Sequence, residues 1–353
     1  MTPTPSIARR RTLGASLGLG DALFATSEER HFARAIEAGL EKVEQGLAAQ
    51  LVFADDIADA AGRYLLDAGG KRVRPVLALL TAQLGDGVTD EVIVGAQAVE
   101  ITHVASLYHD DVMDDAQMRR GVPSAQTVWG NSVAILAGDL LFARASKLIA
   151  GLGEQALTLQ ADVFERLCLG QLHETVGPKP GDDPIEHYLQ VLADKTGSLI
   201  SAAAVIGVLF SNAPKEYREP VEQFGDRVGV AFQLVDDVID LSGAIEQTGK
   251  EAGTDLRAGV PTLPLLYLRR DAQTDAASAA LLARLEEGLA PDADPALFAA
   301  AVAELRAHPV TEATLAEARR WADDAVAALA PLPEGPVKKS LTQFAQAVVE
   351  RSG

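Results

Sequence analysis

The sequence predicts an all-α protein whose helices form a single large domain. Alanine and leucine, which are strong helix formers, are abundant, whereas aromatic residues make up only 5% of the chain. Segments such as residues 27–51 and 91–111 repeat apolar side chains at three- and four-residue spacings, as amphipathic helices do. No strand–helix alternation and no long linker interrupts this pattern. We therefore expect one helical domain over residues 27–350, preceded by a flexible tail at residues 1–26.

The predicted helix boundaries follow from local residue chemistry. Glu28 and Glu29 suit the first turn of a helix, because the amino end of a helix favours negative charge. Pro75 suits the first turn of the next predicted helix, and Asp90 is expected to cap the helix that starts at residue 91. From residue 271 onward the chain is rich in alanine and carries no recognisable motif, which indicates a packing role.

The charge balance and the single cysteine limit the partners and the compartment. The formal net charge of −19 makes nucleic acid and anionic membranes poor partners, so an anionic ligand must meet locally clustered basic residues. Cys168 is the only cysteine in the sequence, which excludes an internal disulfide and indicates a reducing compartment. No apolar run reaches the ~18–20 residues of a membrane-spanning helix, and the amino terminus lacks the apolar segment of a secretory signal. We expect a cytoplasmic protein without a transmembrane segment.

The pattern Asp-Asp-x-x-Asp occurs twice, each time at the end of an apolar segment. Residues four apart on a helix share a face, so the first and last aspartates of each copy point the same way. Clustered carboxylates are costly unless a cation pairs with them. Oxygen ligands of this kind suit Mg²⁺, which retains waters and recruits substrate phosphates. Two facing helices with such ends could hold a diphosphate through shared Mg²⁺, whereas a solvated helix end is the alternative for either copy alone. The copies are Asp110, Asp111 and Asp114, and Asp236, Asp237 and Asp240.

Basic residues accompany the two acidic motifs. In "GGKRVRP", residues 69–75, Lys71 and Arg74 are three apart and can face one anion, while the glycines allow close backbone approach. Arg119 and Arg120 follow the first acidic motif and are expected to end its helix. Adjacent helical residues diverge by about 100°, so these two arginines can serve different anions. Further candidates for anion binding are Lys195, Thr196, Gln233 and Lys250.

Together these motifs resemble those of the trans-isoprenyl (polyprenyl) diphosphate synthases. The segments "GGKRVRP", "HDDVMDDAQMRRG", "GQLHE", "DKTGSL", "FQLVDDVIDLSG" and "GKEAGTDLRAGVPTLPLL" occur in the order of that family, over residues 69–266. The resemblance implies the isoprenoid synthase fold, a helical bundle whose central cavity lies between the helices that carry the two acidic motifs. It also implies a homodimeric prenyltransferase that condenses isopentenyl diphosphate head-to-tail with an allylic diphosphate and releases diphosphate. Transient membrane contact during product release would be compatible with this activity.

The resemblance assigns roles to individual residues, each by its position in the matching motif. The double bond of isopentenyl diphosphate would attack an allylic carbon as diphosphate leaves, so catalysis depends on charge stabilisation rather than on a nucleophilic side chain. Val260 stands where the family often has a second lysine, which leaves the site more dependent on Mg²⁺. About three Mg²⁺ ions per site would be held by Asp110, Asp111, Asp114, Asp236 and Asp240. The allylic diphosphate would meet Arg119, Lys195, Thr196, Gln233 and Lys250. Isopentenyl diphosphate would meet Lys71, Arg74, His103 and Arg120. The catalytic set would be Asp110, Asp114, Asp236, Lys195 and Arg119.

The residues that precede the first acidic motif predict a long product. In the family, the positions of Ala105 and Ser106 floor the product tunnel, with Thr102 farther along the same helix, and all three side chains are small here. Short-chain synthases usually place an aromatic residue at this point. Because a helix rises ~1.5 Å per residue, the tunnel wall extends for about 16 Å. We expect a product longer than geranylgeranyl, in the heptaprenyl to decaprenyl range. If a bulky residue from another helix closes the tunnel, the alternative is a geranylgeranyl or farnesyl diphosphate synthase.

Two further protein classes share parts of this pattern. A terpene cyclase would replace the second acidic motif with an Asn/Ser/Glu metal triad, and "DDVID" argues against that class. A non-catalytic subunit of a heteromeric synthase would lose metal-binding aspartates, whereas this chain retains both sets. The preferred primer and the pathway supplied, whether quinone, carotenoid or other, are left open by the sequence.

Overall fold

The computed structural model describes residues 27–242, 252–290 and 292–351, and these residues are almost entirely helical. The prediction of an all-α fold is confirmed. A two-stranded antiparallel hairpin, β1 (Met118–Arg119) and β2 (Val122–Pro123), is the only sheet in the described residues. The predicted flexible tail at residues 1–26 lies outside them. The helices are α2 (Ser27–Gln50), α3 (Asp56–Asp67), α4 (Val73–Ala82), α5 (Asp90–Met113), α6 (Ala125–Trp129), α7 (Asn131–Ala150), α8 (Glu154–Val176), α9 (Pro184–Leu192), α10 (Ser198–Phe210), α11 (Arg218–Asp240), α13 (Thr254–Arg257), α14 (Leu263–Asp271), α15 (Ala276–Gly288), α16 (Pro295–Ala307), α17 (Pro309–Ala328) and α18 (Pro336–Glu350), with a π-helix η1 (Ala193–Gly197) and a 3₁₀ turn η2 (Lys215–Tyr217).

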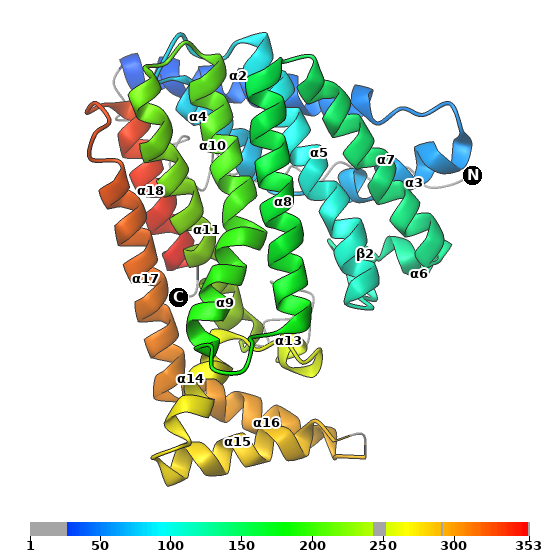
Figure 1. Cartoon of the computed structure of the whole chain (residues 1–353), viewed down its shortest axis with the longest axis vertical. Helices are drawn as coiled ribbons and strands as arrows, with labels where there is room; N and C mark the ends of the chain where they lie inside the picture. Colours follow the sequence, from blue (N-terminus) through cyan, green and yellow to red (C-terminus); the bar gives the residue numbers. More distant parts are fainter. Residues whose placement is uncertain (1–26, 243–251, 291, 352–353) are drawn as a thin grey trace.

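The centre of the bundle is α10, which packs against α4, α5, α8 and α11 (Figure 1). Its sequence is apolar on every side, and a helix of that kind must be buried all round. Gly207 lets it approach α4 closely, because an added Cβ would lie 2.0 Å from Thr81 Oγ1 and 2.3 Å from the carbonyl oxygen of Ala78. α7 flanks α5 on one side of this centre, and α17 covers α11 on the other.

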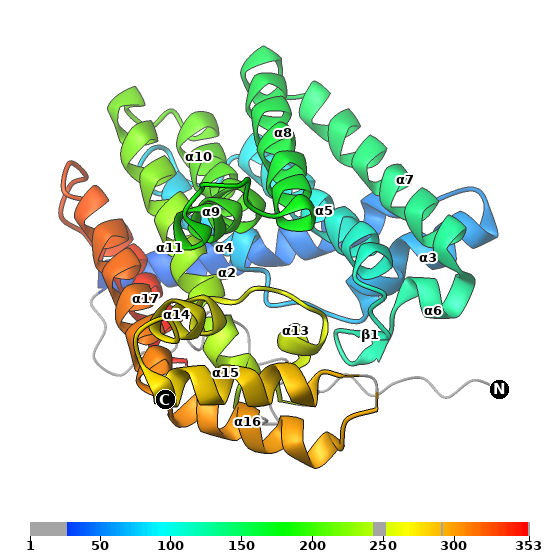
Figure 2. The same ribbon diagram turned by 60° about the horizontal axis from the view of Figure 1, so that its bottom comes forward.

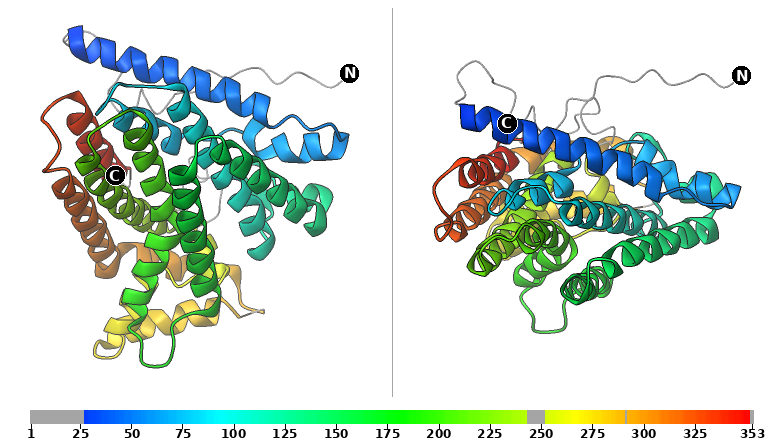
Figure 3. Two further views of the ribbon diagram at one scale, coloured as in Figure 1. Left: turned by 45° about the horizontal axis from the view of Figure 1, so that its top comes forward. Right: turned by 90° about the horizontal axis from the view of Figure 1, so that it is seen from above.

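The C-terminal region contains two kinds of packing. α15 and α16 form a hairpin at one end of the bundle and share a small core with α13 and α14, in which Leu285, Phe298 and Leu305 are buried (Figure 2). α17 and α18 then return to the bundle, where Leu341 and Phe344 join the main core. The packing role expected for this region is therefore divided between the hairpin and the bundle. At the other end of the chain, α2 lies across the bundle and contacts α4 and α5 (Figure 3).

Two local predictions were wrong. The cap of α5 is Thr89, whose hydroxyl accepts the Val92 amide hydrogen, so Asp90 lies inside the first turn. α5 ends at Met113, and Arg119 and Arg120 belong to the hairpin instead of ending the helix. Asp115 and Arg120 have left-handed backbone conformations, with φ of 47° and 53°, which stop the helix and turn the chain back.

One helical run is long and apolar enough to cross a membrane by length and composition. It is Pro184–Phe210, in which η1 joins α9 to α10, and 78% of its most apolar window is buried inside the protein. This is the behaviour of a core helix. The sequence alone did not predict such a run, because the apolar segment of α10 is short. The run becomes long enough only because η1 joins α10 to α9 in one continuous helix.

Candidate active site

The first acidic motif ends α5 with two carboxylates that have no partner in the described part of the chain. Asp110 is half-buried and Asp114 is exposed at the helix end. The Asp114 amide donates to the Asp110 carbonyl oxygen at 2.8 Å, which keeps both residues in helical register. Burial raises the pKa of Asp110 to about 6, Lys195 and Arg119 oppose this rise, and Asp114 adds to it. This pair is therefore suited to accept a cation.

The middle aspartate of each motif is buried and already bound. Arg119 approaches Asp111 at 2.6 Å, and this pair fixes the hairpin to the end of α5. Asp237 accepts hydrogen bonds from the Tyr188 hydroxyl at 2.8 and 3.0 Å and from the Leu263 amide at 3.1 Å. Burial raises the pKa of Asp237 well above its ordinary value. The structure therefore gives the middle aspartates a role in holding walls of the site together.

The second motif presents Asp236 and Asp240 near the end of α11. Asp236 pairs with Arg351 at 3.2 Å, and the Arg351 guanidinium lies 3.9 Å from the centre of the Phe232 ring. Burial raises the pKa of Asp236, while Arg351 and Lys71 oppose the rise. Asp240 accepts the Asp255 amide hydrogen at 3.1 Å and so anchors the start of α13. Arg351 is a site residue that the sequence analysis missed, since it lies far from every motif.

Lys195 lies on η1 and faces the first motif. Its ammonium group contacts Glu174 of α8 at 2.5 Å. Burial lowers the pKa of Lys195, but the carboxylates of Asp110 and Glu174 outweigh that effect and the pKa is raised, so the group stays protonated. Thr196 is the half-buried neighbour on η1. A π-helix of this kind is rare and often occurs at functional sites.

A second cationic group surrounds His103 of α5. Burial and the nearby charges of Arg74 and Arg120 hold the pKa of His103 well below its ordinary value, so the ring is neutral. Burial lowers the pKa of Arg74 to about 10, with Arg120 adding to the effect. Arg120 donates to the carbonyl oxygens of Leu65, at 2.6 Å, and of Gly69. We call Arg74, Arg120 and His103 the arginine cage; its concentration of positive charge suits an anion.

Arg72 differs from the basic residues on either side of it. It is 4% exposed, has φ of 53°, and pairs with Glu44 at 2.7 Å and with buried Glu100 at 3.2 Å. Gly70 makes room for it, because an added Cβ would lie 2.4 Å from Arg72 Nη1. Lys71, in contrast, is exposed. The left-handed backbone at Arg72 makes the side chains of Lys71 and Arg72 point in different directions. The sequence did not predict the buried ion pair between Arg72 and Glu100.

The remaining candidates in the diphosphate site lie on α11 and beyond. Gln233 is half-buried on α11, one turn before Asp236. Lys250 lies outside the described residues. Val260, which replaces a frequent lysine, is held by a hydrogen bond from its amide to the Asp255 carbonyl oxygen. The nearby Arg257 stacks 4.1 Å from the centre of the Phe298 ring, so its guanidinium is engaged with the α15–α16 hairpin.

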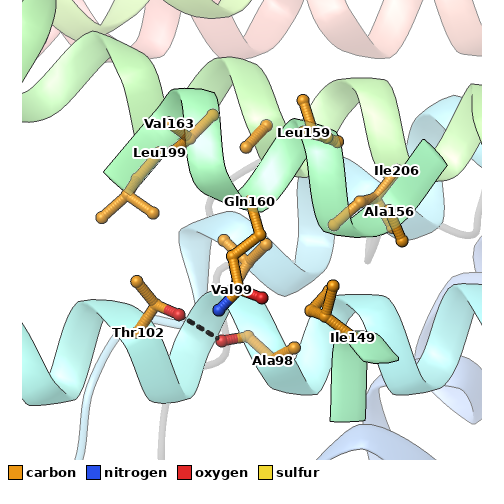
Figure 4. Close-up of a pocket in the computed structure, with 11 residues that line it drawn as sticks. Ala98, Val99, Thr102, Ile149, Ala156, Leu159, Gln160, Val163, Leu199 and Ile206 are labelled. Atoms are coloured by element: carbon orange, nitrogen blue, oxygen red, sulfur yellow. Dashed lines mark hydrogen bonds between the residues drawn. The ribbon is translucent and has the colours of Figure 1, made fainter. Parts of the chain in front are cut away.

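An apolar cavity of about 20 Å³ lies between α5, α8 and α10 (Figure 4). Such a volume holds about one water molecule. Ala98, Val99 and Thr102 of α5 face Leu159 and Gln160 of α8 across it. Of the three residues expected to control product length, Thr102 therefore lines the cavity. Ala105 and Ser106 do not: Ala105 is fully buried in the core, and the Ser106 hydroxyl donates to the His103 carbonyl oxygen.

The far end of this cavity is closed by bulky apolar residues. Ile149 of α7 and Ile206 of α10 line it, together with the small Ala98 and Ala156. Phe210 packs against the cluster formed by Ala98, Ile149 and Ala156. Helices other than α5 therefore supply the bulk at this end, which is the arrangement considered above as the alternative to an open tunnel.

The donor set at the end of α5 fits a metal ion whose coordination is completed by a substrate. No group of three His, Cys, Asp or Glu side chains within residues 27–242, 252–290 and 292–351 is placed to hold an ion by itself. Asp110 and Asp114 instead provide two carboxylates from adjacent turns of one helix end. Mg²⁺ accepts such a site, because waters and substrate phosphates complete its coordination.

Comparisons with known proteins agree with this arrangement. Residues 55–293 match the model of the family described as "Polyprenyl synthetase". The nonaprenyl diphosphate synthase of Mycobacterium tuberculosis (strain ATCC 25618 / H37Rv) is 43% identical, over 97% of this chain and 98% of that protein. The crystal structure of a polyprenyl synthase from Caulobacter crescentus CB15, complexed with calcium and isoprenyl diphosphate, superimposes with a TM-score of 0.82 at 31% identity, covering 91% of this chain and 97% of that one.

A third relative has a shorter product in its name. The geranylgeranyl pyrophosphate synthase from Corynebacterium glutamicum gives a TM-score of 0.78 at 39% identity, covering 93% of this chain and 99% of that one. The family resemblance, the isoprenoid synthase type of all-α fold and the prenyltransferase class expected from the sequence are confirmed by these matches. The chain belongs to the polyprenyl synthetase family.

Proposed function

We propose that this chain is a Mg²⁺-dependent prenyltransferase that condenses isopentenyl diphosphate head-to-tail with an allylic diphosphate and yields a trans-polyprenyl diphosphate. One observation carries the proposal: α5 ends in the carboxylates of Asp110 and Asp114, which we call the acidic mouth, it carries His103 of the separate arginine cage, and its earlier residues line an apolar cavity. Two anionic substrates with apolar tails require this combination. The acidic mouth would take the first diphosphate through metal, and the arginine cage would take the second directly.

The metal-binding residues are Asp110, Asp114 and Asp236, with Asp111 and Asp240 as supporting contributors. About three Mg²⁺ ions per site are proposed from the family resemblance, and a relative crystallised with calcium supports the use of a divalent ion. Bound Mg²⁺ supplies positive charge to the departing diphosphate. Asp111 and Asp237 contribute mainly by fixing the hairpin and α14 beside the metal-binding carboxylates.

The allylic diphosphate is proposed to bind Arg119, Lys195, Thr196, Gln233 and Lys250. Protonated Lys195 provides fixed positive charge beside Asp110, where negative charge develops as the carbon–oxygen bond breaks. Arg119 can serve the diphosphate and Asp111 together, because a guanidinium has five N–H donors. The apolar walls exclude water from the allylic cation.

Isopentenyl diphosphate is proposed to bind Lys71, Arg74, His103 and Arg120. Neutral His103 can donate one N–H to a phosphate oxygen, while the guanidinium groups of Arg74 and Arg120 neutralise the negative charge of the phosphate. The double bond of this substrate then attacks the allylic carbon, and the proton lost in forming the new double bond passes to the released diphosphate. No side chain of the chain needs to act as the base.

The product is proposed to be longer than geranylgeranyl, in the heptaprenyl to decaprenyl range. The nonaprenyl diphosphate synthase relative and the small side chain of Thr102 at the cavity support this length. Geranylgeranyl diphosphate is the alternative product, favoured by the bulk of Ile149 and Phe210 at the end of the cavity and by the Corynebacterium relative. A tail longer than the present cavity requires these helices to separate.

A homodimer and a cytoplasmic location are proposed as the working state. α7 and α8 contact each other and expose several large apolar side chains, including Leu136 at 60% and Leu172 at 53%. Leu140, Leu157 and Phe164 add to this surface. Exposed apolar area of this kind commonly marks an interface, and a second copy of the chain is the proposed occupant.

The decisive experiment incubates the purified chain with labelled isopentenyl diphosphate and dimethylallyl, geranyl or farnesyl diphosphate, with Mg²⁺ or with a chelator. We expect Mg²⁺-dependent chain growth, with products sized by chromatography. Products that stop at geranylgeranyl would support the alternative length. Absence of turnover by the chain alone, restored by a second protein, would indicate a subunit of a heteromeric synthase.

A further inference from the structure

η1 is held between α8 and α11, and each side contributes contacts that follow the helix geometry (Figure 1). On α8 the contacts come from Arg166, Gly170 and Glu174, which are spaced four apart and so share one face. Glu174 binds the Lys195 ammonium group at 2.5 Å. Gly170 lies against the backbone of Lys195, since an added Cβ would be 2.7 Å from its amide nitrogen.

Arg166 makes the third contact and connects both flanking helices to η1. Its Nε donates to Asp194 Oδ1 at 3.1 Å and its Nη2 to the Ala193 carbonyl oxygen at 3.3 Å, both on η1. Its Nη1 donates to Asp226 of α11 at 3.2 Å. One planar guanidinium thereby fixes the two elements at set distances, which a lysine ammonium group cannot do.

The α11 side leaves η1 little freedom to move. A Cβ on Gly197 would lie 2.9 Å from the Asp226 carbonyl oxygen, and one on Gly229 would lie 2.5 Å from the Gly197 Cα. Because the two backbones are in such close contact, η1 cannot move toward α11 unless α11 moves with it. The element that carries Lys195 is therefore positioned from both sides, and Arg166 is the only side chain among the described residues that hydrogen-bonds both α11 and η1 at this point.

We propose that Arg166 is a positioning residue for the allylic diphosphate site, acting through η1 to set the place of Lys195. This inference rests on the proposed function for its kinetic consequence, but its structural part is independent of that function. Arg166 itself touches no substrate in this scheme. It ensures that the Lys195 ammonium group stands beside Asp110 before substrate arrives, so that no binding energy is used to assemble the site.

The test compares Arg166→Met, Arg166→Lys and Gly170→Ala with Arg284→Met, a control that breaks the pair between Arg284 and Glu304 on the distant α15–α16 hairpin. We expect Arg166→Met and Gly170→Ala to lower kcat about 10- to 100-fold and to raise KM for the allylic primer, because small displacements of catalytic groups have effects of this size. KM for isopentenyl diphosphate should stay within about twofold, and Arg166→Lys should fall between wild type and Arg166→Met. The control should match wild type. Unchanged kinetics in both site variants, or equal rises in the two KM values, would overturn the proposal.

Hydrogen exchange supplies a readout that does not depend on catalysis. Amides of residues 193–198 should exchange at least about 10-fold faster in Arg166→Met, while the core of α10 keeps its protection. Unchanged exchange at η1 would overturn the positioning role even if activity were lost. If wild type shows no turnover with any primer, the proposed function fails, and hydrogen exchange alone then decides whether Arg166 positions η1.

Discussion

The two acidic motifs share one sequence pattern but differ in their surroundings. On α5, Asp110 and Asp114 meet no hydrogen-bond or ion-pair partner among the described residues, and the basic groups that act on Asp110 electrostatically are Lys195 and Arg119. On α11, Asp236 is paired with Arg351, and Lys71 also acts on it. The first motif can therefore accept a cation directly, whereas a metal ion at the second motif would have to displace Arg351 from Asp236. The same sequence pattern can therefore have different ion-pair partners in the folded protein, because those partners come from other helices and segments.

The largest expected effect is the loss of turnover when a metal-binding carboxylate is removed. Asp110→Ala should lower kcat by about 10³-fold, since a lost metal ligand removes several kcal/mol of charge stabilisation. Asp236→Ala should be nearly as severe, although Arg351 then gains freedom to bind the diphosphate and can offset part of the loss. Steady-state assays at saturating Mg²⁺ measure both values. Near-normal turnover in either variant would remove the metal-binding argument for that motif.

The proposed isopentenyl diphosphate site, which comprises the arginine cage and Lys71, should respond differently from the acidic mouth. Lys71→Ala and Arg120→Ala should raise KM for isopentenyl diphosphate about 10-fold, the loss expected for a charge-assisted hydrogen bond, with a smaller effect on KM for the primer. Lys71 also acts on Asp236 electrostatically, so it tests whether the two sites are separable. Equal rises in both KM values would mean that one site serves both diphosphates.

The contrast between outer and middle aspartates should appear in stability. Asp237→Ala leaves the Tyr188 hydroxyl and the Leu263 amide without their acceptor, which should lower the free energy of unfolding by about 2–4 kcal/mol. Asp236→Ala, only one residue away, should change it by less than about 1 kcal/mol, because its pair with Arg351 is partly exposed. Urea denaturation of the metal-free proteins measures both. Similar losses would show that both aspartates are structural.

The length of the product tests whether the α5 residues that precede Asp110 line the path of the growing tail. Ala105→Phe or Ser106→Phe should shorten the product to about farnesyl or geranylgeranyl length, because overpacking this region costs ~1–3 kcal/mol. Ile149→Ala should act in the opposite direction, since Ile149 closes the far end of the cavity. Chromatography of the products decides both. If neither substitution before Asp110 changes the length, the tail does not pass Ala105 and Ser106, and the small side chains at these positions do not set the product length.

The sequence predicted features that depend on neighbouring residues and missed those that depend on distant ones. Helix formation and the shared face of Asp110 and Asp114 follow from spacings within one segment. The partners of the second motif do not, because Tyr188 and Arg351 approach α11 from segments 49 and 115 residues away in sequence. Only packing of the whole bundle brings them there. Their assigned roles, like those of all the site residues, stay predictions.

Local conformation explains the other differences. The end of α5 was expected near Arg120 because no proline or glycine intervenes before Gly121. The left-handed backbone at Asp115 ends the helix earlier, and aspartate is among the residues that tolerate that conformation. The side chain of Arg72 points into the protein for the same reason, because its backbone is also left-handed, with φ of 53° just before α4. Backbone states of single non-glycine residues leave no periodic trace, so pattern analysis cannot find them.

The smallest expected effect concerns the stability of the unpartnered carboxylate on α5. Because the pKa of Asp110 is raised to about 6 from an ordinary value of 3.8, the folded protein binds this proton more tightly than the unfolded chain does. Ionisation of Asp110 therefore lowers the free energy of unfolding progressively between about pH 4 and pH 6, and the full loss persists above pH 6. Asn at position 110 cannot ionise, so Asp110→Asn should stabilise the metal-free protein at pH 7 by about 1–2 kcal/mol after allowance for solvent screening, and by almost nothing at pH 4.

Urea denaturation at both pH values in the presence of a chelator measures this difference. Asp236→Asn is the matched variant, because the ion pair between Asp236 and Arg351 should make any gain in stability smaller. Saturating Mg²⁺ should reverse the order at pH 7, since only the carboxylate gains from the metal. A variant that is less stable than wild type without metal at pH 7 would show that Asp110 has a stabilising partner, and the difference between the two motifs would then disappear.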